Sequence, residues 1–210
     1  GEKIDYDRDE IKLSAETATV YIPVHKTARL PLSFEYTNIP EYFDPANLRY
    51  TLSSSEVLVE GEDHIIDKYS DIFLGYVDMR AITLENPSAR FRVSLPEGLI
   101  TQNYISIVNI DFDLTDYVES NFNATQINII NVPKEYKVTS NISKIPVTIL
   151  GPADVVNSLS AKDIVVQVDM STREITQTGQ YRVQAEVFLP GKQNAWAIGT
   201  YAITITVKEQ

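Results

Sequence analysis

The feature that most constrains the fold of this 210-residue chain is an internal repeat of about 90 residues. Corresponding segments occur in the same order at offsets of 90 to 94 residues: Asn38-Ile39-Pro40 and Asn131-Val132-Pro133, Gly61 and Gly151, Asp78 and Asp169, Leu95-Pro96 and Leu189-Pro190. A repeat at this spacing indicates that one supersecondary unit is built twice. We therefore predict two copies, residues 26–118 and 119–210, with residues 1–25 as an N-terminal extension or the tail of a preceding repeat.

Strand signals dominate both copies. Runs rich in Val, Ile, Tyr and Thr, many alternating with period two, predict strands near residues 18–24, 28–36, 90–95, 104–112, 126–131, 146–150, 164–170, 181–189 and 201–207. Helical spacing occurs only at Ile65, Ile66 and Tyr69 and at the corresponding residues of the second copy, Val155, Val156 and Leu159. The sequence predicts an all-β protein of two tandem domains, each with one short helical turn.

The repeated residues have simple structural interpretations. An X-Pro step favours extended backbone before a turn, and Gly61 and Gly151 fit a strand end that needs positive φ or a tight approach. Asp78 and Asp169 close a strand, where a carboxylate accepts backbone N–H bonds. The first copy has one extra residue between Asp71 and Asp78, which fits a β-bulge.

Composition excludes several function classes. The chain has no Cys and only two His, His25 and His64, so thiolate chemistry and Cys-ligated metals are excluded. The net charge is −11, and the part up to Val118 holds 21 acidic and 10 basic residues against 8 and 8 after it. This charge repels phosphate backbones, so nucleic acid is not an expected partner. No window resembles a membrane span of about 18 apolar residues.

One acidic cluster is a candidate metal site. Glu60, Glu62, Asp63 and Asp67 lie beside His64 within eight residues, and carboxylates are ligands for hard cations. The same segment aligns with a strand-to-helix turn in the second copy, where acidic residues favour a helix N-terminus electrostatically. It also lacks the ligand spacing of a calcium-binding loop. We expect a surface turn here, and we predict no metal and no cofactor.

Paired carboxylates can carry acid/base catalysis, and many acidic pairs in this chain would qualify without one being singled out. Asp111 and Asp113 alternate with Phe112 and Leu114, a pattern that places the carboxylates on one face of a strand. A hydrolase would need such a pair in a cleft with shifted pKa values. A solvated sheet face explains the pattern as well, and no nucleophile motif accompanies it. We predict no catalytic residues and no enzymatic activity.

The single tryptophan is a candidate for ligand stacking. Trp196 lies close to Tyr201, and aromatic residues near a loop can stack on a sugar or anchor a protein contact. Large aromatic side chains more often pack in cores. We expect Trp196 to seal the end of the second domain's core, and we keep a carbohydrate-binding or adhesion role as the alternative.

A family resemblance rests on the second copy. Its segments Val147-Thr148-Ile149-Leu150-Gly151-Pro152, Val168-Asp169-Met170-Ser171, Gly179-Gln180-Tyr181-Arg182-Val183 and Val187-Phe188-Leu189-Pro190 resemble the YbbR-like domain of bacterial envelope proteins. The first copy matches less closely, since Glu62 replaces the proline after the glycine, and its assignment as a first YbbR-like domain at residues 26–118 rests partly on the repeat. The resemblance covers nearly all of residues 119–210.

The resemblance implies a setting and a partner. YbbR-like domains occur as tandem copies outside the cytoplasm of Gram-positive bacteria, behind an N-terminal membrane helix that we expect upstream of this chain. The best-understood members regulate a membrane diadenylate cyclase, so the chain is expected to be a non-enzymatic, extracytoplasmic protein-interaction module. The family has no catalytic residues to transfer. The partner, the number of copies, their relative orientation and the oligomeric state do not follow from the sequence.

Overall fold

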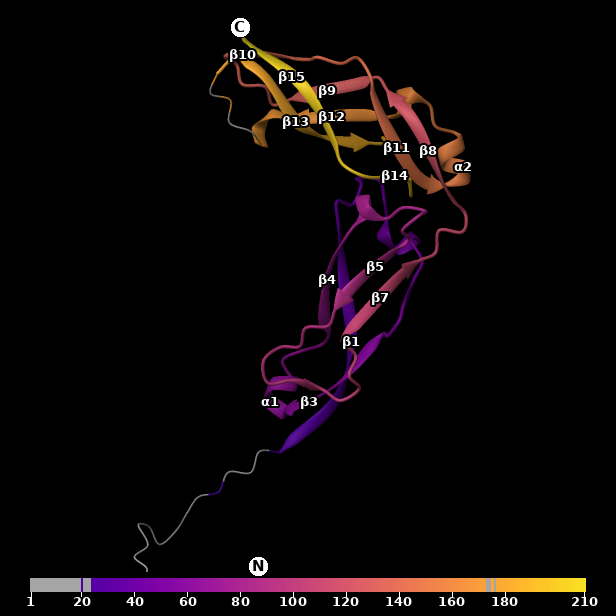
Figure 1. The fold of residues 1–210 in the computed structure, drawn as a ribbon, viewed down its shortest axis with the longest axis vertical. Helices are drawn as coiled ribbons and strands as arrows, with labels where there is room; N and C mark the ends of the chain where they lie inside the picture. The colour runs from indigo at the N-terminus through magenta and orange to yellow at the C-terminus, as the bar shows by residue number, and fades with distance from the viewer. Residues whose placement is uncertain (1–19, 21–23, 173–174, 176) are drawn as a thin grey trace, which may run out of the picture.

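The computed structural model describes residues 20, 24–172, 175 and 177–210. It forms two β domains arranged end to end (Figure 1). Most of the predicted extension at 1–25, including the strand expected at 18–24, lies outside the described residues. None of the described helices is long and apolar enough to cross a membrane.

The first domain is built from seven strands and a single-turn helix. Its elements are β1 (His25–Thr37), η1 (Pro45–Asn47), β2 (Tyr50–Leu52), β3 (Glu56–Glu62), α1 (Asp63–Ile66), β4 (Ile72–Asp78), η2 (Met79–Ala81), β5 (Ser88–Arg92), β6 (Ile100–Thr101) and β7 (Ile107–Phe112). They form two sheets with the strand orders β4-β1-β3-β6 and β2-β7-β5.

The second domain repeats this plan. Its elements are β8 (Tyr117–Ala124), β9 (Gln126–Ile130), β10 (Tyr136–Ser140), β11 (Ile145–Pro152), α2 (Ala153–Asn157), η3 (Ala161–Asp163), β12 (Val165–Asp169), η4 (Met170–Thr172), β13 (Gly179–Phe188), β14 (Trp196–Ala197) and β15 (Tyr201–Glu209). The sheet orders are β10-β15-β13-β12-β9 and β14-β11-β8. The all-β prediction, with one short α-helix in each domain, is confirmed.

The two domains share one topology. The first half of β1 pairs antiparallel with β3 and its second half pairs parallel with β4, whereas in the second domain β8 pairs with β11 and β9 pairs parallel with β12. The pairs β3–β6 and β11–β14, β2–β7 and β10–β15, and β5–β7 and β13–β15 also correspond. The repeat in sequence is therefore a repeat in strand connection. The connection between the domains runs from β7 to β8, and β8 starts at Tyr117.

The repeated glycines are positions of close approach. A Cβ on Gly151 would lie 2.6 Å from the Cβ of Ala195, and one on Gly61 would lie 2.7 Å from the carbonyl oxygen of Gly98. In each domain the glycine faces the segment that leads into the short edge strand, Ala195 before β14 and Gly98–Leu99 before β6. Of the two roles proposed from the sequence, the structure shows the tight approach.

Three apolar clusters stabilise the chain. One fills the second domain around Ile149, Val166 and Ile205, and another fills the far end of the first domain around Val57, Val59 and Val108. The third contains Phe43, Met79 and Phe112 from the first domain together with Leu150 and Trp196 from the second. The two domains therefore share a core at their junction.

Candidate functional site: the domain junction and the first-domain surface

The repeated asparagine and aspartate form a matched turn in each domain. Asn131 adopts φ 54° and donates from its amide to Asp169 at 2.8 Å, and Asn38 also has φ 54°. Asp169 further accepts from the backbone N–H of Ser171 at 2.8 Å, as Asp78 does from Arg80 at 3.0 Å. The short polar side chain of asparagine tolerates positive φ. These residues fix the ends of β4 and β12, which is the structural role that the sequence indicated.

The electrostatics of these turns agree with that role. Side-chain hydrogen bonds from Asn131 and Ser171 lower the pKa of Asp169. Partial burial raises the pKa of Asp78, but hydrogen bonds from Arg80 and Asn38 outweigh it and leave this pKa below its ordinary value. Both carboxylates are therefore stabilised in the charged form as hydrogen-bond acceptors, which does not suit a general acid.

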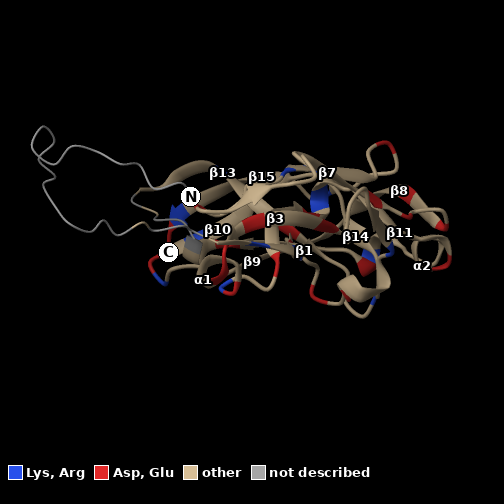
Figure 2. Cartoon of the chain, turned by 90° about the horizontal axis from the view of Figure 1, so that it is seen from below, with Lys and Arg blue, Asp and Glu red and all other residues tan. Residues whose placement is uncertain are grey.

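The acidic cluster lies at the end of the first domain far from the junction. Glu60 and Glu62 lie on β3, and Asp63 and His64 lie in α1 (Figures 1 and 2). Glu60 contacts His25 at 2.9 Å, Asp67 forms an ion pair with Lys26 at 2.8 Å, and Glu62 lies 3.3 Å from His64. Across the described ranges, no group of three or more His, Asp or Glu side chains is placed to hold a metal ion.

Removal of divalent metal is expected to leave stability unchanged. A cation bound only to the folded state would raise the melting temperature, because binding shifts the folding equilibrium by mass action. The carboxylates from Glu60 to Asp67 are instead distributed over separate contacts with basic side chains. Thermal melts with EDTA, with added calcium and without either should coincide. A melting temperature that falls with EDTA and recovers with calcium would show a metal site.

The second carboxylate pair is a solvated sheet face with separate partners. Phe112 and Leu114 are buried at 5% and 8% exposure, whereas Asp111 is exposed. Asp113 forms an ion pair with Arg49 at 2.9 Å, and its hydrogen bonds from Thr115 lower its pKa. The Asp113 carboxylate is thus held as a charged hydrogen-bond acceptor by Arg49 and Thr115.

Trp196 is part of the domain junction. Its side chain is 1% exposed, and its ring contacts Phe43 at a centroid distance of 5.2 Å and Tyr117 at 5.9 Å. Packing was the expected role, but the partners include Phe43 of the first domain and not only the second domain's core. A sugar cannot stack on this ring, so the residue that favoured the carbohydrate-binding alternative does not support it.

Hydrogen bonds tie the domains together around this aromatic contact. The backbone N–H of Gly199 donates to the carbonyl of Arg80 at 2.8 Å. Asn47 donates to the side chain of Asn194 at 3.1 Å, and the backbone N–H of Leu84 donates to Glu119 at 2.6 Å. The junction therefore has a buried aromatic centre surrounded by polar contacts, the usual layout of a packed interface.

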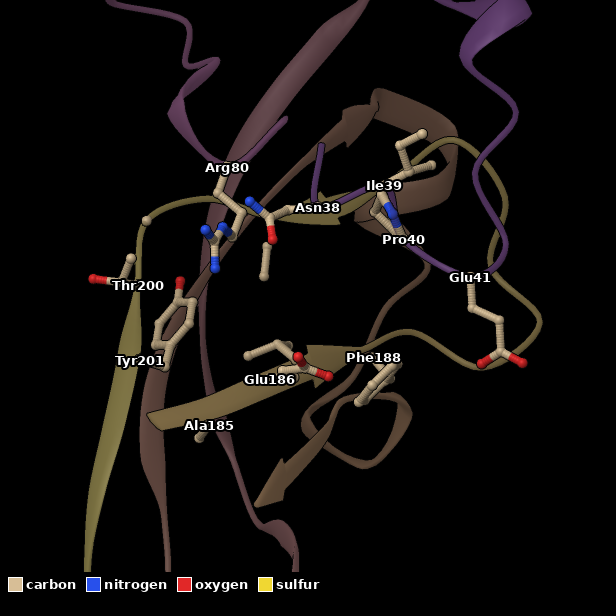
Figure 3. A pocket seen from close by; sticks show the side chains of 13 residues that line it. Asn38, Ile39, Pro40, Glu41, Arg80, Ala185, Glu186, Phe188, Thr200 and Tyr201 are labelled. Atoms are coloured by element: carbon tan, nitrogen blue, oxygen red, sulfur yellow. The ribbon is translucent and has the colours of Figure 1, made fainter. Parts of the chain in front are cut away.

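A small pocket of about 140 Å³ opens beside the junction (Figure 3). The first domain supplies Asn38 and Arg80, and the second supplies Glu186 and Tyr201. Arg80 donates to Asp78 at 3.0 Å, and the hydroxyl of Tyr201 donates to the carbonyl of Ile198 at 2.6 Å. Two of the polar groups that line the pocket are thus engaged in holding the fold, and the pocket presents no pair of groups arranged for catalysis.

Exposed apolar side chains distinguish the first domain from the second. Of the twelve large hydrophobic residues that the structure describes as exposed, nine lie in the first domain: Ile39, Tyr42, Tyr50, Phe73, Tyr76, Leu84, Ile100, Tyr104 and Ile107. Only Ile142 belongs to the second. The sequence placed the excess of negative charge in this part of the chain, but it did not indicate that these apolar residues are exposed. The exposure of Phe73 and Tyr76 on β4 depends on how the strands pair, which no local pattern in the sequence shows.

Comparison with known proteins finds a family match in the second domain. Residues 123–194 match the family model described as "YbbR-like protein". No curated protein matches the chain. Similar solved structures include a YbbR-like domain from Listeria monocytogenes (15% identity, TM-score 0.34, 44% of this chain and 95% of that one) and a YbbR-like protein from Streptococcus pneumoniae (10%, 0.34, 92% and 99%). A protein from Streptococcus thermophilus is similar at 18% identity with a TM-score of 0.30, over 48% of this chain and 89% of that one.

Proposed function

We propose that this chain, whose second domain is YbbR-like, is a non-enzymatic protein-interaction module in which the first domain contacts the partner and the second domain supports it. The observation that carries the proposal is the asymmetry between two domains of one topology. Nine of the twelve large hydrophobic residues that the structure describes as exposed lie in the first domain. Exposed apolar side chains beyond scattered single ones mark interaction surfaces.

Charge supports the same assignment. The part of the chain up to Val118 holds 21 acidic and 10 basic residues, whereas the remainder is balanced at 8 and 8. A field of one sign speeds the encounter with a partner of opposite sign and is screened by salt. The partner surface would therefore be basic and partly apolar. Because the junction is packed, the second domain holds this surface at a fixed orientation.

The resemblance to YbbR-like proteins suggests where the first domain meets its partner. We place the module outside the cytoplasm of a bacterium, held near the membrane by an anchor elsewhere in the protein, with a membrane diadenylate cyclase as the candidate partner. The chain's own role is then to bind and to regulate, while the catalytic step belongs to the partner.

Co-purification from native membranes tests the proposal. The anchored full-length protein is expected to retain the cyclase in mild detergent, and higher salt should slow association. Neutralising the tip of the first domain (Glu60→Gln, Glu62→Gln, Asp63→Asn) should weaken this salt dependence. The matched control neutralises exposed carboxylates of the second domain (Asp154→Asn, Glu186→Gln, Glu209→Gln) and should leave it unchanged. Absence of the cyclase would discard the partner, and equal effects of the two triple variants would discard the first domain as the steering surface.

A further inference from the structure

The end of the first domain that lies far from the junction corresponds to the end of the second domain that forms the junction (Figure 1). In the second domain the junction surface includes Leu150 on β11, which pairs with Trp196 on β14. The corresponding pair in the first domain is Glu60 on β3 with Ile100 on β6. Glu60 and Leu150 each stand one residue before the repeated glycine, so the two pairs occupy the same place in the repeat.

A third position of this surface also repeats. Tyr117, whose ring is part of the junction, starts β8 opposite Pro152. His25 starts β1 opposite Glu62 in the same register. The first domain therefore repeats three positions through which the second domain holds its neighbour. We call them the tip face: His25, Glu60 and Ile100.

The repeated positions are buried in one domain and exposed in the other. Leu150 and Trp196 are buried at the junction, where residues of the first domain pack on them. Ile100 is 55% exposed, and Glu60 is partly exposed. Four residues after Ile100, Tyr104 is 85% exposed with φ 54°, a conformation that costs energy for a tyrosine and is concentrated at functional sites. The apolar centre of the tip face is not covered by the described part of the chain.

A carboxylate on the tip face determines what it can bind. Glu60 stands where the second domain has Leu150, and its side chain is held in place by Nδ1 of His25 at 2.9 Å and by the amide of Gln102. A purely apolar partner, such as the ring of Phe43 in the junction, would remove this carboxylate from water at a high cost. A basic side chain would instead form a charge-assisted hydrogen bond with it.

We propose that the tip face binds a second protein in the way that the second domain holds the first. An apolar side chain of the partner covers Ile100, and a neighbouring Lys or Arg of the partner pairs with Glu60. This inference rests on the function proposed above, and it names the surface of the first domain and the chemistry that meets it. The excess of acidic residues up to Val118 favours the same basic partner.

Other copies of this chain fit the tip face less well. A further domain docked as in the junction would place an apolar surface like that of Phe43 and Met79 on the carboxylate of Glu60. Two chains joined tip to tip would bring together two acidic ends, each with Glu62 and Asp63 close to Glu60 in sequence. Like charges held close together disfavour such a contact.

Site-specific photo-cross-linking tests the proposal on the anchored full-length protein in its native membranes. The probe is p-benzoylphenylalanine introduced at position 100, and the matched control carries it at position 142, an exposed isoleucine of the second domain. Irradiation is expected to join position 100, but not position 142, to one partner protein. Mass spectrometry of the cross-linked peptide identifies the partner and the attachment site, where we expect a Lys or Arg beside an apolar residue.

Binding of the whole chain to the identified partner tests the individual contacts. Ile100→Lys should weaken binding about 10-fold or more and Glu60→Gln about 5-fold, as for residues at the centre of an interface. Glu56→Gln removes the same charge at the other end of β3 and should leave the affinity within about 2-fold. Glu60→Arg should abolish binding, and exchange of the partner's basic residue for Glu should restore it. Thermal melts check that each variant is folded.

The outcomes separate this surface from the proposed function. Equal cross-linking at positions 100 and 142, or an affinity unchanged by Ile100→Lys and Glu60→Gln, would overturn the proposal. A product with a second copy or with another domain of the same protein would overturn it in favour of an assembly contact. Capture of the cyclase without a product at position 100 would retain the proposed function and discard the tip face. A product at position 100 with a different protein, reversed by the charge exchange, would support the tip face and contradict the cyclase as partner.

Discussion

Replacement of Trp196 by alanine is expected to lower the free energy of unfolding by about 3 to 5 kcal/mol, the usual cost of truncating a buried large aromatic side chain. The ring is 1% exposed and lies in the cluster that both domains share. Its removal leaves a cavity lined by Phe43 and Tyr117, which cannot close without moving one domain against the other. The expected result is therefore a loss of coupling as well as a loss of stability.

Calorimetry distinguishes these two effects. The unmodified chain should unfold in one transition, and Trp196→Ala should show two, because each domain keeps its own apolar cluster. Phe43→Ala should act in the same direction from the other side of the junction. The double variant should cost less than the sum of the single ones, since the two rings are in contact at 5.2 Å. Tyr104→Ala, at an exposed position, should change nothing. A single transition in Trp196→Ala with a loss below about 1 kcal/mol would show that the junction does not depend on this ring.

The features that were predictable from the sequence depend on residues that lie close together in the chain. Alternating apolar residues predicted the strands, and the spacing of Ile65, Ile66 and Tyr69 after a glycine predicted α1. These features depend on residues close in the chain, so a pattern can carry them. The repeat added non-local information, because matching residues in two copies must occupy matching positions. The turn aspartates Asp78 and Asp169 were placed correctly for that reason.

The domain junction and the missing ladder between β4 and β5 were not predictable in the same way. Trp196 contacts Phe43 across more than 150 residues of sequence, and nothing near either residue indicates the other. The extra residue before Asp78 predicted the bulge in β4, but it did not predict that β4 and β5, unlike β12 and β13, form no ladder among the described residues. The exposure of side chains such as Phe73 and Tyr76 depends on these non-local strand neighbours. The proposed binding role therefore rests on the domain whose exposed residues the sequence did not indicate.

Replacement of Gly151 by alanine is the second large effect that we expect, at about 2 to 3 kcal/mol of lost stability, near the upper end for overpacking a core. The added methyl group would lie 2.6 Å from the Cβ and 2.9 Å from the Cα of Ala195, and 3.1 Å from a methyl group of Val156. One of these contacts is with backbone, which cannot turn away as a flexible side chain does. The glycine thus permits the chain before β14 to pack against β11, and this contact positions Trp196 one residue later.

The matched variants separate crowding from the general cost of replacing glycine. Gly191→Ala introduces a methyl group with nothing within 4 Å but at φ 70°, so it should cost only the backbone strain of about 1 kcal/mol. Adding Ala195→Gly to Gly151→Ala removes the nearest clashing atom and should restore part of the lost stability. Chemical denaturation of the four proteins measures these differences. Equal losses for Gly151→Ala and Gly191→Ala, without recovery in the double variant, would mean that close approach is not why glycine stands at this point of the repeat. Recovery of stability in the double variant would support close approach as the reason for Gly151. The same reason would then apply to Gly61, where an added Cβ would lie 2.7 Å from the carbonyl oxygen of Gly98.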